Sequence, residues 1–553
     1  MIEERFIQIY EDSFRQNWDL PALTDYNTKR TLHYKELAEE IAKIHILLRK
    51  CGIKKGDKIA LVGKNTPQWC IVYMATITYG AVLVPILQDF NPQDICHIVN
   101  HSDSVLLFIN DSIWTHIDPT ALTQIRAVIS IDNWECLFQR EGEKTAQYLA
   151  ELTELFAATY PAGFTPDDIV YADNGNEELA VINYTSGTTG FSKGVMLSGN
   201  NFAGNVMFGV RSHLHYRNSR CLSFLPLAHA YGCAFDFLVP LATGSHITLL
   251  GKIPSPKILV KALAEVKPHL IICVPLVLEK IYRKQLQPLI SKPAMRIALR
   301  IPILNNIIFN RINNKLIQAL GGAFEEVIVG GAPLNAEVES FLRKIKFPFT
   351  VGYGMTECAP LISYTPHREF IASSSGRTLH GYVETKTIPD SSTSETGEIC
   401  VRGEHVMIGY YKNEQATRQV IDCDGWLHTG DVGSISHDGT IFIKGRSKTM
   451  LLGANGQNIY PEIIEAKINN MPYVAESLVV ERNSKLVALI VPDYESLNAD
   501  GLAESELDEI MERNRLQVNE IVAPYEKITA IEIHREEFEK TPKRSIKRYL
   551  YNK

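Results

Sequence analysis

The chain has 553 residues, of which 45% are hydrophobic and 22% charged, and its formal net charge is -7. This length predicts several packed units, and the hydrophobic fraction excludes disorder as the dominant state. The 56 lysines and arginines stand against 63 acidic residues, so overall charge gives no support to nucleic-acid binding. None of the ten cysteines forms a C-x-x-C pair, and the first 14 residues lack an apolar signal core. We therefore expect a cytoplasmic protein that is large enough to be an enzyme.

Short apolar runs alternate with helical patterns through most of the first 440 residues. The runs KIALVG, AVLVPI, VLLFI, AVIS, HITLL and HLIICV are typical of strands, and YKELAEEIAKIHILLRK is typical of a helix. This alternation predicts an α/β protein, in which helices flank largely parallel sheets.

The stretch from Asn65 to Gln88 contains no charged residue and is long enough to suggest a membrane span. Gly80 interrupts it, however, and its flanks have the pattern of a buried βα unit. This pattern predicts a strand at 58–62, a helix at about 68–79 and a strand at 81–86.

The strongest local signal is Y-T-S-G-T-T-G-F-S-K-G, from Tyr184 to Gly194, which follows the apolar run 179–183. Glycines allow the backbone to approach an anion closely, and the hydroxyls and Lys193 supply further donors. The loop therefore suits a polyphosphate, although its spacing differs from the G-x-x-x-x-G-K-[ST] loop of P-loop NTPases. The alternative is an ordinary surface turn rich in Gly, Ser and Thr.

Residues 280–324 contain eight basic residues and no acidic one, interleaved with apolar residues. One interpretation is a pair of helices packed on the large unit with a solvated basic face. The other is a peripheral membrane-surface contact through residues 280–315, because basic amphipathic helices attract anionic lipid. The basic residues are Lys280, Arg283, Lys284, Lys292, Arg296, Arg300, Arg311 and Lys315.

A domain boundary is predicted near Lys444–Lys448. The preceding residues are rich in Gly, Asp and His and indicate strands and turns, whereas Pro461 and the acids after it indicate a helix start. Two strands at 475–481 and 485–491, a helical stretch at 504–521 and a strand near 528–533 are expected to follow. The sequence thus predicts a large unit, residues 1–445, hinged to a small mobile α+β unit, residues 446–553.

The chain resembles the adenylate-forming superfamily of acyl-CoA synthetases, luciferases and peptide-synthetase adenylation domains. Five stretches carry the resemblance: YTSGTTGFSKGV, GGAPL (330–334), GYGMTE (352–357), WLHTGD (426–431) and GRSKTMLLGANGQNIYPEIIE (445–465). It implies a large domain of helix-flanked sheets with a β-subdomain. The basic segment before GGAPL is similar to an insertion in long-chain fatty acid–CoA ligases.

The resemblance assigns roles to the matching residues. Lys193 and Glu357 are expected to be catalytic, and Thr185, Thr356 and Glu357 to supply the hard oxygens that Mg²⁺ prefers. Asp431 and Arg446 would bind the ribose, and Lys448 would be the hinge. Further nucleotide and coenzyme A positions are Ser186, Gly187, Thr188, Thr189, Gly190, Gly331, Ala332, Pro333, Tyr353, Gly354, Met355 and Gly453.

Some of these residues also have plain structural interpretations. Tyr353, expected to stack on adenine, could equally be a core tyrosine, and Asp431 a turn residue. His229, in LPLAHAYG, matches a stretch that lines the acyl pocket, but a single histidine is equally compatible with a structural role.

The C-terminus departs from the family pattern P-K-T-x-x-G-K-I. The chain reads KTPKRSIK from Lys540, which puts Ser545 where the catalytic lysine should stand. Lys543 or Lys547 is therefore expected to act in its place. The alternative is a solvated basic tail.

The resemblance implies an enzyme that activates a fatty acid, with a long chain expected, in two steps. ATP and the acid give an acyl-adenylate and pyrophosphate, and coenzyme A then gives the thioester and AMP. The alternatives are a fatty acyl-AMP ligase or an enzyme that loads a carrier protein's phosphopantetheine, and an acyl-nucleotide sensor without activity.

Overall fold

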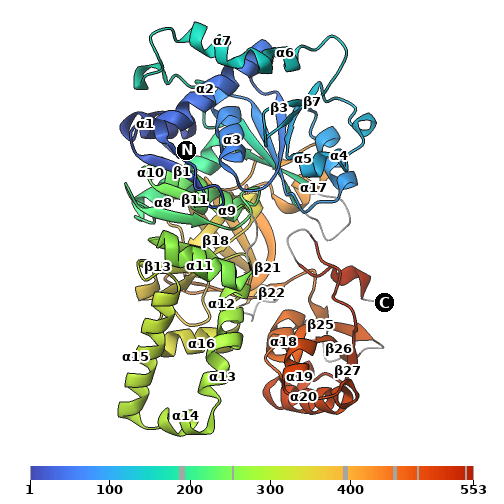
Figure 1. The fold of residues 1–553 in the computed structure, drawn as a ribbon. Coiled ribbons are helices and arrows are strands. Elements are labelled where there is room, and N and C mark those ends of the chain that lie inside the picture. The colour runs from blue at the N-terminus through green and yellow to red at the C-terminus, as the bar shows by residue number, and fades with distance from the viewer. Residues whose placement is uncertain are drawn as a thin grey trace.

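The computed structural model describes residues 2–185, 193–251, 255–389, 396–452, 458–482, 485–541 and 545–551. Figure 1 shows a large body of layered sheets and helices, with the last hundred residues gathered in a separate group. The α/β class expected from the sequence is confirmed.

The largest sheet has eight strands, and helices pack on its faces (Figure 1). Its central neighbours, from β8 to β6, pair in parallel, whereas the pairs at both edges are antiparallel. The sheet is therefore mixed rather than uniformly parallel. The strands in order are β20 (Gly409–Tyr410), β9 (Lys193–Ser198), β8 (Leu179–Thr185), β4 (Val82–Ile86), β3 (Lys58–Val62), β5 (Ser104–Ile109), β6 (Ala127–Ser130) and β7 (Cys136–Gln139).

The uncharged stretch forms the buried unit β3–α3–β4. Helix α3 (Pro67–Tyr79) begins at the N-cap Thr66, whose hydroxyl accepts a hydrogen bond from the backbone of Trp69. It ends at Gly80, whose φ of 86° a side chain would strain. Among the described residues, no helix is long and apolar enough to cross a membrane.

Two further layers contain parallel strands. One sheet has the order β10 (Arg220–Ser223), β11 (His246–Leu249), β1 (Pro21–Asp25) and β2 (Thr31–His33), and the other is β12 (Leu270–Cys273), β13 (Glu326–Val329) and β14 (Phe349–Val351). Other helices of the large body are α1 (Phe6–Gln16), α2 (Tyr34–Lys50), α4 (Pro92–His101), α5 (Asp111–Trp114), α6 (Thr145–Ala150), α7 (Leu152–Thr159), α8 (Gly199–Arg211), α9 (Ala230–Cys233), α10 (Val239–Thr243), α11 (Pro256–Val266) and α16 (Ala336–Lys344).

The expected β-subdomain consists of two antiparallel sheets. They are β15 (Tyr353–Gly354), β16 (Leu361–Tyr364) and β17 (Arg377–Thr378), and β18 (Val383–Pro389), β19 (Gly397–Gly403), β21 (Leu427–Ile435) and β22 (Ile441–Arg446). Helix α17 (Glu414–Val420) lies between β20 and β21 in the chain.

The basic segment folds into a helical projection from the large body (Figure 1). Its elements are α12 (Pro275–Ile281), a π-helical turn (Tyr282–Leu286), α13 (Gln287–Ile290), α14 (Pro293–Ala298) and α15 (Pro302–Ala319), with α14 at the far end. The packed helix pair forms only at its base, where Leu316 is buried and Phe309 contacts Phe341.

The C-terminal residues have their own hydrophobic clusters. The main core extends from Phe6 to Ile441, whereas two smaller clusters begin at Ile459 and Leu478. The elements are β23 (Leu451–Leu452), β24 (Asn458–Ile459), α18 (Pro461–Ile468), β25 (Val474–Arg482), β26 (Lys485–Pro492), α19 (Tyr494–Ala499), α20 (Leu507–Ile521) and β27 (Ala530–Ile533). The expected α+β composition of this small unit is confirmed.

Candidate active site

The predicted phosphate loop comes between β8 and β9, two paired strands of the large sheet. Thr185 is the last residue of β8, and it lies directly opposite Lys193, the first residue of β9. The pairing places the hydroxyl-bearing end of one strand beside the lysine of the next. The other predicted loop residues, Ser186, Gly187, Thr188, Thr189 and Gly190, lie outside the described residues.

A tyrosine that the sequence interpretation missed links Lys193 to Glu357. The Lys193 Nζ atom lies 4.7 Å from the ring centroid of Tyr410, a favourable distance for a cation–π contact. The Tyr410 hydroxyl donates a hydrogen bond of 2.9 Å to Glu357 Oε1. Burial, and then the negative charge of Glu357, raise the pKa of Tyr410, so the hydroxyl remains a donor.

The position of Tyr410 is fixed by its neighbours in the chain. Strand β20 pairs Tyr410 with Val195 of β9, two residues after Lys193. Tyr411 donates to Asp103 at 2.7 Å, and Lys412 forms an ion pair of 2.7 Å with the same carboxylate. The only sequence signal for this arrangement is the aromatic pair after Gly409.

Tyr353, Asp431 and Arg446 form a second group of contacting residues. The Tyr353 hydroxyl donates to Asp431 Oδ2 at 2.7 Å, and Arg446 Nε donates to Oδ1 at 3.1 Å. Asp431 is only 6% exposed, and this burial raises the pKa of its carboxyl, while Arg446 and Tyr353 oppose the shift. The three residues come from β15, β21 and β22, and Asp431 and Arg446 are directly paired across the strands.

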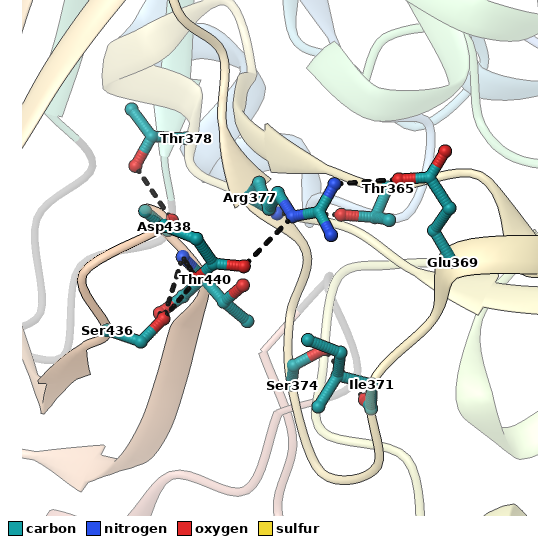
Figure 2. A network of polar contacts seen from close by, with 10 residues as sticks. Thr365, Glu369, Ile371, Ser374, Arg377, Thr378, Ser436, Asp438 and Thr440 are labelled. Atoms are coloured by element: carbon teal, nitrogen blue, oxygen red, sulfur yellow. Dashed lines mark hydrogen bonds and ion pairs between the residues drawn. The ribbon is translucent and has the colours of Figure 1, made fainter.

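A polar network holds the turn between β21 and β22 (Figure 2). The Arg377 guanidinium binds Glu369 at 2.7 Å and Asp438 at 3.2 Å. Asp438 also accepts hydrogen bonds from the Ser436 hydroxyl and the Thr440 backbone, which keep the pKa of its carboxyl low. Exposed ion pairs stabilise a fold little, so the consequence is mainly geometric: the hairpin that carries Asp431 is fixed to strand β17.

A cavity joins the nucleotide motifs to an apolar wall. Gly330, Gly331 and the segment from Gly352 to Thr356 line one side, together with His229. The apolar lining consists of Leu214, Tyr231, Phe235, Ile272, Ile328, Pro360, Leu361 and Tyr364. One cavity is therefore lined both by residues of the predicted nucleotide motifs and by apolar side chains.

Tyr231, which lines the cavity, leaves no room for a side chain at Gly330 of the GGAPL motif. A Cβ atom at Gly330 would lie 2.9 Å from the Tyr231 ring, whose hydroxyl donates to the Ile328 carbonyl at 3.1 Å. Gly331 has a φ of 84°, and the backbone beyond it, at Ala332 and Pro333, is exposed. This backbone is open for a flat base to lie against.

His229 has a structural role that the sequence left open. It is the N-cap of α9, and its Nδ1 accepts a hydrogen bond of 3.3 Å from the backbone of Tyr231. It also lines the cavity, and its role in substrate binding stays a prediction.

The predicted C-terminal site residues lie apart from these groups in the contacts that the structure records. Lys448 is exposed just after β22, and Lys547 forms an ion pair of 3.3 Å with Glu539. Gly453 and Lys543 lie outside the described residues. Backbone contacts of Lys540 with Ile546 and of Thr541 with Ser545 hold the two ends of the tail loop together, which places Ser545 at the base of that loop.

Two family models match the sequence and together cover most of the chain. Residues 10–411 match the family described as AMP-binding enzyme, and residues 448–553 match the AMP-binding enzyme C-terminal domain. The chain therefore belongs to the AMP-binding enzyme family.

Curated relatives match most of the chain. It is 28% identical over 509 residues to long chain acyl-CoA synthetase 5 of Arabidopsis thaliana, covering 84% of this chain and 73% of that protein. It is 28% identical over 487 residues to the long-chain-fatty-acid–CoA ligase FadD15 of Mycobacterium tuberculosis, covering 83% and 77%.

Solved structures of low identity share the fold. ATP-bound MatB from Rhodopseudomonas palustris matches with a TM-score of 0.74 and 21% identity, over 99% of this chain and 98% of that one. A Mycobacterium tuberculosis fatty acyl CoA synthetase matches with a TM-score of 0.66 and 18% identity, over 99% and 97%.

Proposed function

We propose that the protein is an ATP-dependent fatty acid–coenzyme A ligase that releases AMP and pyrophosphate, with a long-chain acid as substrate. The observation that carries the proposal is the cavity that residues of the predicted nucleotide motifs and apolar side chains line together. The named activities of the long-chain relatives support the same substrate class.

The residues divide the adenylation step among them. Tyr353, Asp431 and Arg446 hold the nucleoside, and the apolar wall holds the acyl chain, so that the carboxylate meets the α-phosphorus in a fixed orientation. Lys193 lies where it can neutralise phosphate charge. The thiol of coenzyme A then attacks the acyl carbonyl, and AMP leaves.

Glu357 suits a divalent cation such as Mg²⁺. Its carboxylate is a hard oxygen donor, it is oriented by the Tyr410 hydroxyl, and it follows the Thr356 hydroxyl in the same turn. The turn packs against β9, whose first residue Lys193 is paired with Thr185. A cation held there would supply neutralisation of the phosphate charge.

The test is ATP–pyrophosphate exchange with unbranched carboxylic acids of increasing length. We expect exchange to rise with chain length and thioester to form when free coenzyme A is added. If none of the acids supports exchange, the proposal is overturned in favour of a sensor without activity. Exchange without thioester, restored by a phosphopantetheine carrier, would favour the carrier-loading enzyme.

We propose that the chain divides into residues 1–445 and a mobile unit of residues 446–553, and that Lys543 or Lys547 completes the adenylation site. The separate hydrophobic clusters support the division. Alanine at Lys543, at Lys547 and at both should lower pyrophosphate exchange in at least one single variant. Lys527→Ala, at an exposed position of the same unit, is the matched control. Unchanged exchange in the double variant would exclude both lysines.

We also propose that the helical projection makes peripheral contact with anionic lipid. Its far end combines exposed apolar and basic side chains: Ile297 is 64% and Ile303 is 76% exposed, beside exposed Arg296 and Arg300. Leu289, Ile301, Leu304 and Ile307 are exposed on the same projection. Apolar groups that enter the bilayer interface, surrounded by cations, are typical of interfacial membrane binding.

Not all basic residues of the segment are available for lipid, however. Lys284 forms an ion pair of 3.0 Å with Glu495, and Arg283 donates to the Asn469 carbonyl, so these two residues contact the small unit. The membrane contact is therefore assigned to α14 and the first half of α15.

Sedimentation with vesicles tests this contact. The protein should pellet with phosphatidylserine vesicles at low salt and much less with phosphatidylcholine alone. Arg296→Gln with Arg300→Gln removes two cations and should weaken binding about 30-fold, since each cation near the surface contributes about 1 kcal/mol. Ile297→Ser with Ile303→Ser should also weaken it, whereas Val170→Ser, at a 73% exposed position elsewhere, should not. Equal pelleting of all variants would place the contact elsewhere.

A further inference from the structure

Three metal-ligating side chains meet on one face of the β-subdomain, outside the cavity. Strands β19 and β21 are antiparallel, and their register places Cys400 directly opposite His428. Glu398 is two residues from Cys400, and side chains two apart in a strand point to the same face. The register shifts between Glu398 and Cys400, so that Glu398 pairs with Val432.

The distances suit a single cation. His428 Nδ1 lies 2.8 Å from Glu398 Oε2 and 3.7 Å from Cys400 Sγ, and the three ligand atoms all lie within 4.8 Å of one another. Tetrahedral zinc with ordinary bond lengths separates sulfur and nitrogen ligands by about 3.6 Å and nitrogen and oxygen ligands by about 3.4 Å. For the pair of Glu398 and His428, binding needs the carboxylate to move back by about half an ångström.

The surrounding groups hold these ligands in place. Glu398 Oε1 accepts a hydrogen bond of 3.0 Å from the Gly430 backbone, which leaves Oε2 toward the histidine. Asp422 Oδ2 lies 3.7 Å from His428 Nε2, on the other side of the ring. Asp422 is itself fixed by the backbone amides of Asp424 and Trp426. A metal-bound histidine usually donates its other ring N–H to a carboxylate, and Asp422 would fill this role if it moved closer to Nε2.

Exposure also fits a site with an entry path. Cys400 is fully buried, but the side chains of His428 and Glu398 are 29% and 27% exposed. From this geometry we infer that Glu398, Cys400 and His428 form a site for a thiophilic divalent cation such as Zn²⁺. A water molecule takes the fourth position; the thiol releases its proton to solvent, and the neutral imidazole binds through Nδ1 with its ring proton on Nε2, on the side of Asp422.

The site has a structural consequence for the strand that carries Asp431. In β21, His428 lies three residues before Asp431 and Gly430 lies one residue before it. Both contact Glu398. A bound ion would therefore tie the start of β21 to β19. This inference does not depend on the proposed ligase activity.

Cobalt titration of the full-length, chelator-treated protein tests the site. Addition of Co²⁺ should produce thiolate-to-metal charge-transfer absorption at one equivalent, and Zn²⁺ should abolish it. Cys400→Ser and His428→Gln should each lose the absorption. Cys423→Ser, which removes an exposed thiol from the loop before β21, should retain it.

Asp422→Asn provides a second measurement that does not remove a ligand. It should bind Co²⁺ about 10- to 100-fold more weakly, as outer-partner changes do. Far-ultraviolet circular dichroism of each variant establishes that it is folded. Absorption that persists in Cys400→Ser, or that never appears in the folded wild-type protein, would overturn the site.

Discussion

Asp431 and Lys547 are both expected to act on the nucleotide, and the structure holds them in different ways. Asp431 is buried and accepts hydrogen bonds from Tyr353 and Arg446, so its orientation is set by strands β15 and β22 of the β-subdomain. Lys547 forms an ion pair with Glu539 of its own unit. The residues expected to bind the nucleotide are thus preorganised in the β-subdomain, whereas the contribution expected from the small unit depends on how its tail is presented. The predictions below test this contrast.

The largest effect is expected at Glu357, which the Tyr410 hydroxyl orients. Glu357→Gln keeps the shape of the side chain but removes its charge, and should lower kcat/KM for pyrophosphate exchange about 100- to 1,000-fold, as loss of an electrostatic group in an active site does. Glu384→Gln, in an exposed ion pair with Arg402, should change exchange by less than about twofold. Comparable activity of the two variants would remove Glu357 from the site.

In the small unit, the strongest effect should be on stability rather than on nucleotide binding. Arg548 is 19% exposed and pairs with Glu465 at 2.5 Å and Glu462 at 3.6 Å. Burial raises the pKa of the Glu465 carboxyl, and Arg548 opposes the shift, so Arg548→Ala leaves a buried carboxyl without its cation. We expect a loss of about 3 kcal/mol in the free energy of unfolding.

Urea denaturation followed by circular dichroism measures this loss. Arg418→Ala, which removes an exposed arginine from an i,i+4 pair with Glu414, should lose about 0.5 kcal/mol or less. If the two substitutions destabilise equally, the buried pair does not anchor the tail.

The core of the large unit should lose stability in acid. His405 is fully buried, and burial lowers the pKa of its imidazole to about 4, whereas in the unfolded chain it is near the ordinary 6.5. Protons then bind the unfolded state preferentially, so the stability present above pH 6.5 is lost as the pH falls toward 4. The loss is about 2 kcal/mol at pH 5 for this residue.

Unfolding free energies measured between pH 7 and pH 5 test whether stability falls as the pH is lowered. His405→Gln should flatten the dependence, and His437→Gln, at an exposed position, should leave it unchanged. An identical slope in wild type and His405→Gln would show that the acid sensitivity arises elsewhere.

Elements that local sequence patterns encode could be predicted, whereas contacts between distant residues could not. The unit from Lys58 to Ile86 was predictable because its apolar runs and Gly80 act locally. Motif residues such as Asp431 were found through the family resemblance. The contact between Tyr353 and Asp431 spans 78 positions, and it depends on how separate sheets lie together, which no local pattern encodes.

Tyr410 is the clearest example of this limit, and its substitution should have the smallest effect. Its hydroxyl reaches Glu357 across 53 positions. Tyr410→Phe removes the donor but keeps the ring beside Lys193, so Glu357 loses its orienting partner while the cation–π contact remains. We expect about a tenfold fall in exchange, equivalent to one hydrogen bond to a charged group.

Tyr216→Phe provides the matched control, because an exposed tyrosine there contacts Glu325 at 3.2 Å outside the cavity lining. It should leave exchange unchanged. The dependence on Mg²⁺ gives a second readout, since a poorly oriented Glu357 should raise the concentration needed for half-maximal exchange. A fall in Tyr410→Phe without any shift in that concentration would mean that the hydroxyl acts on something other than Glu357.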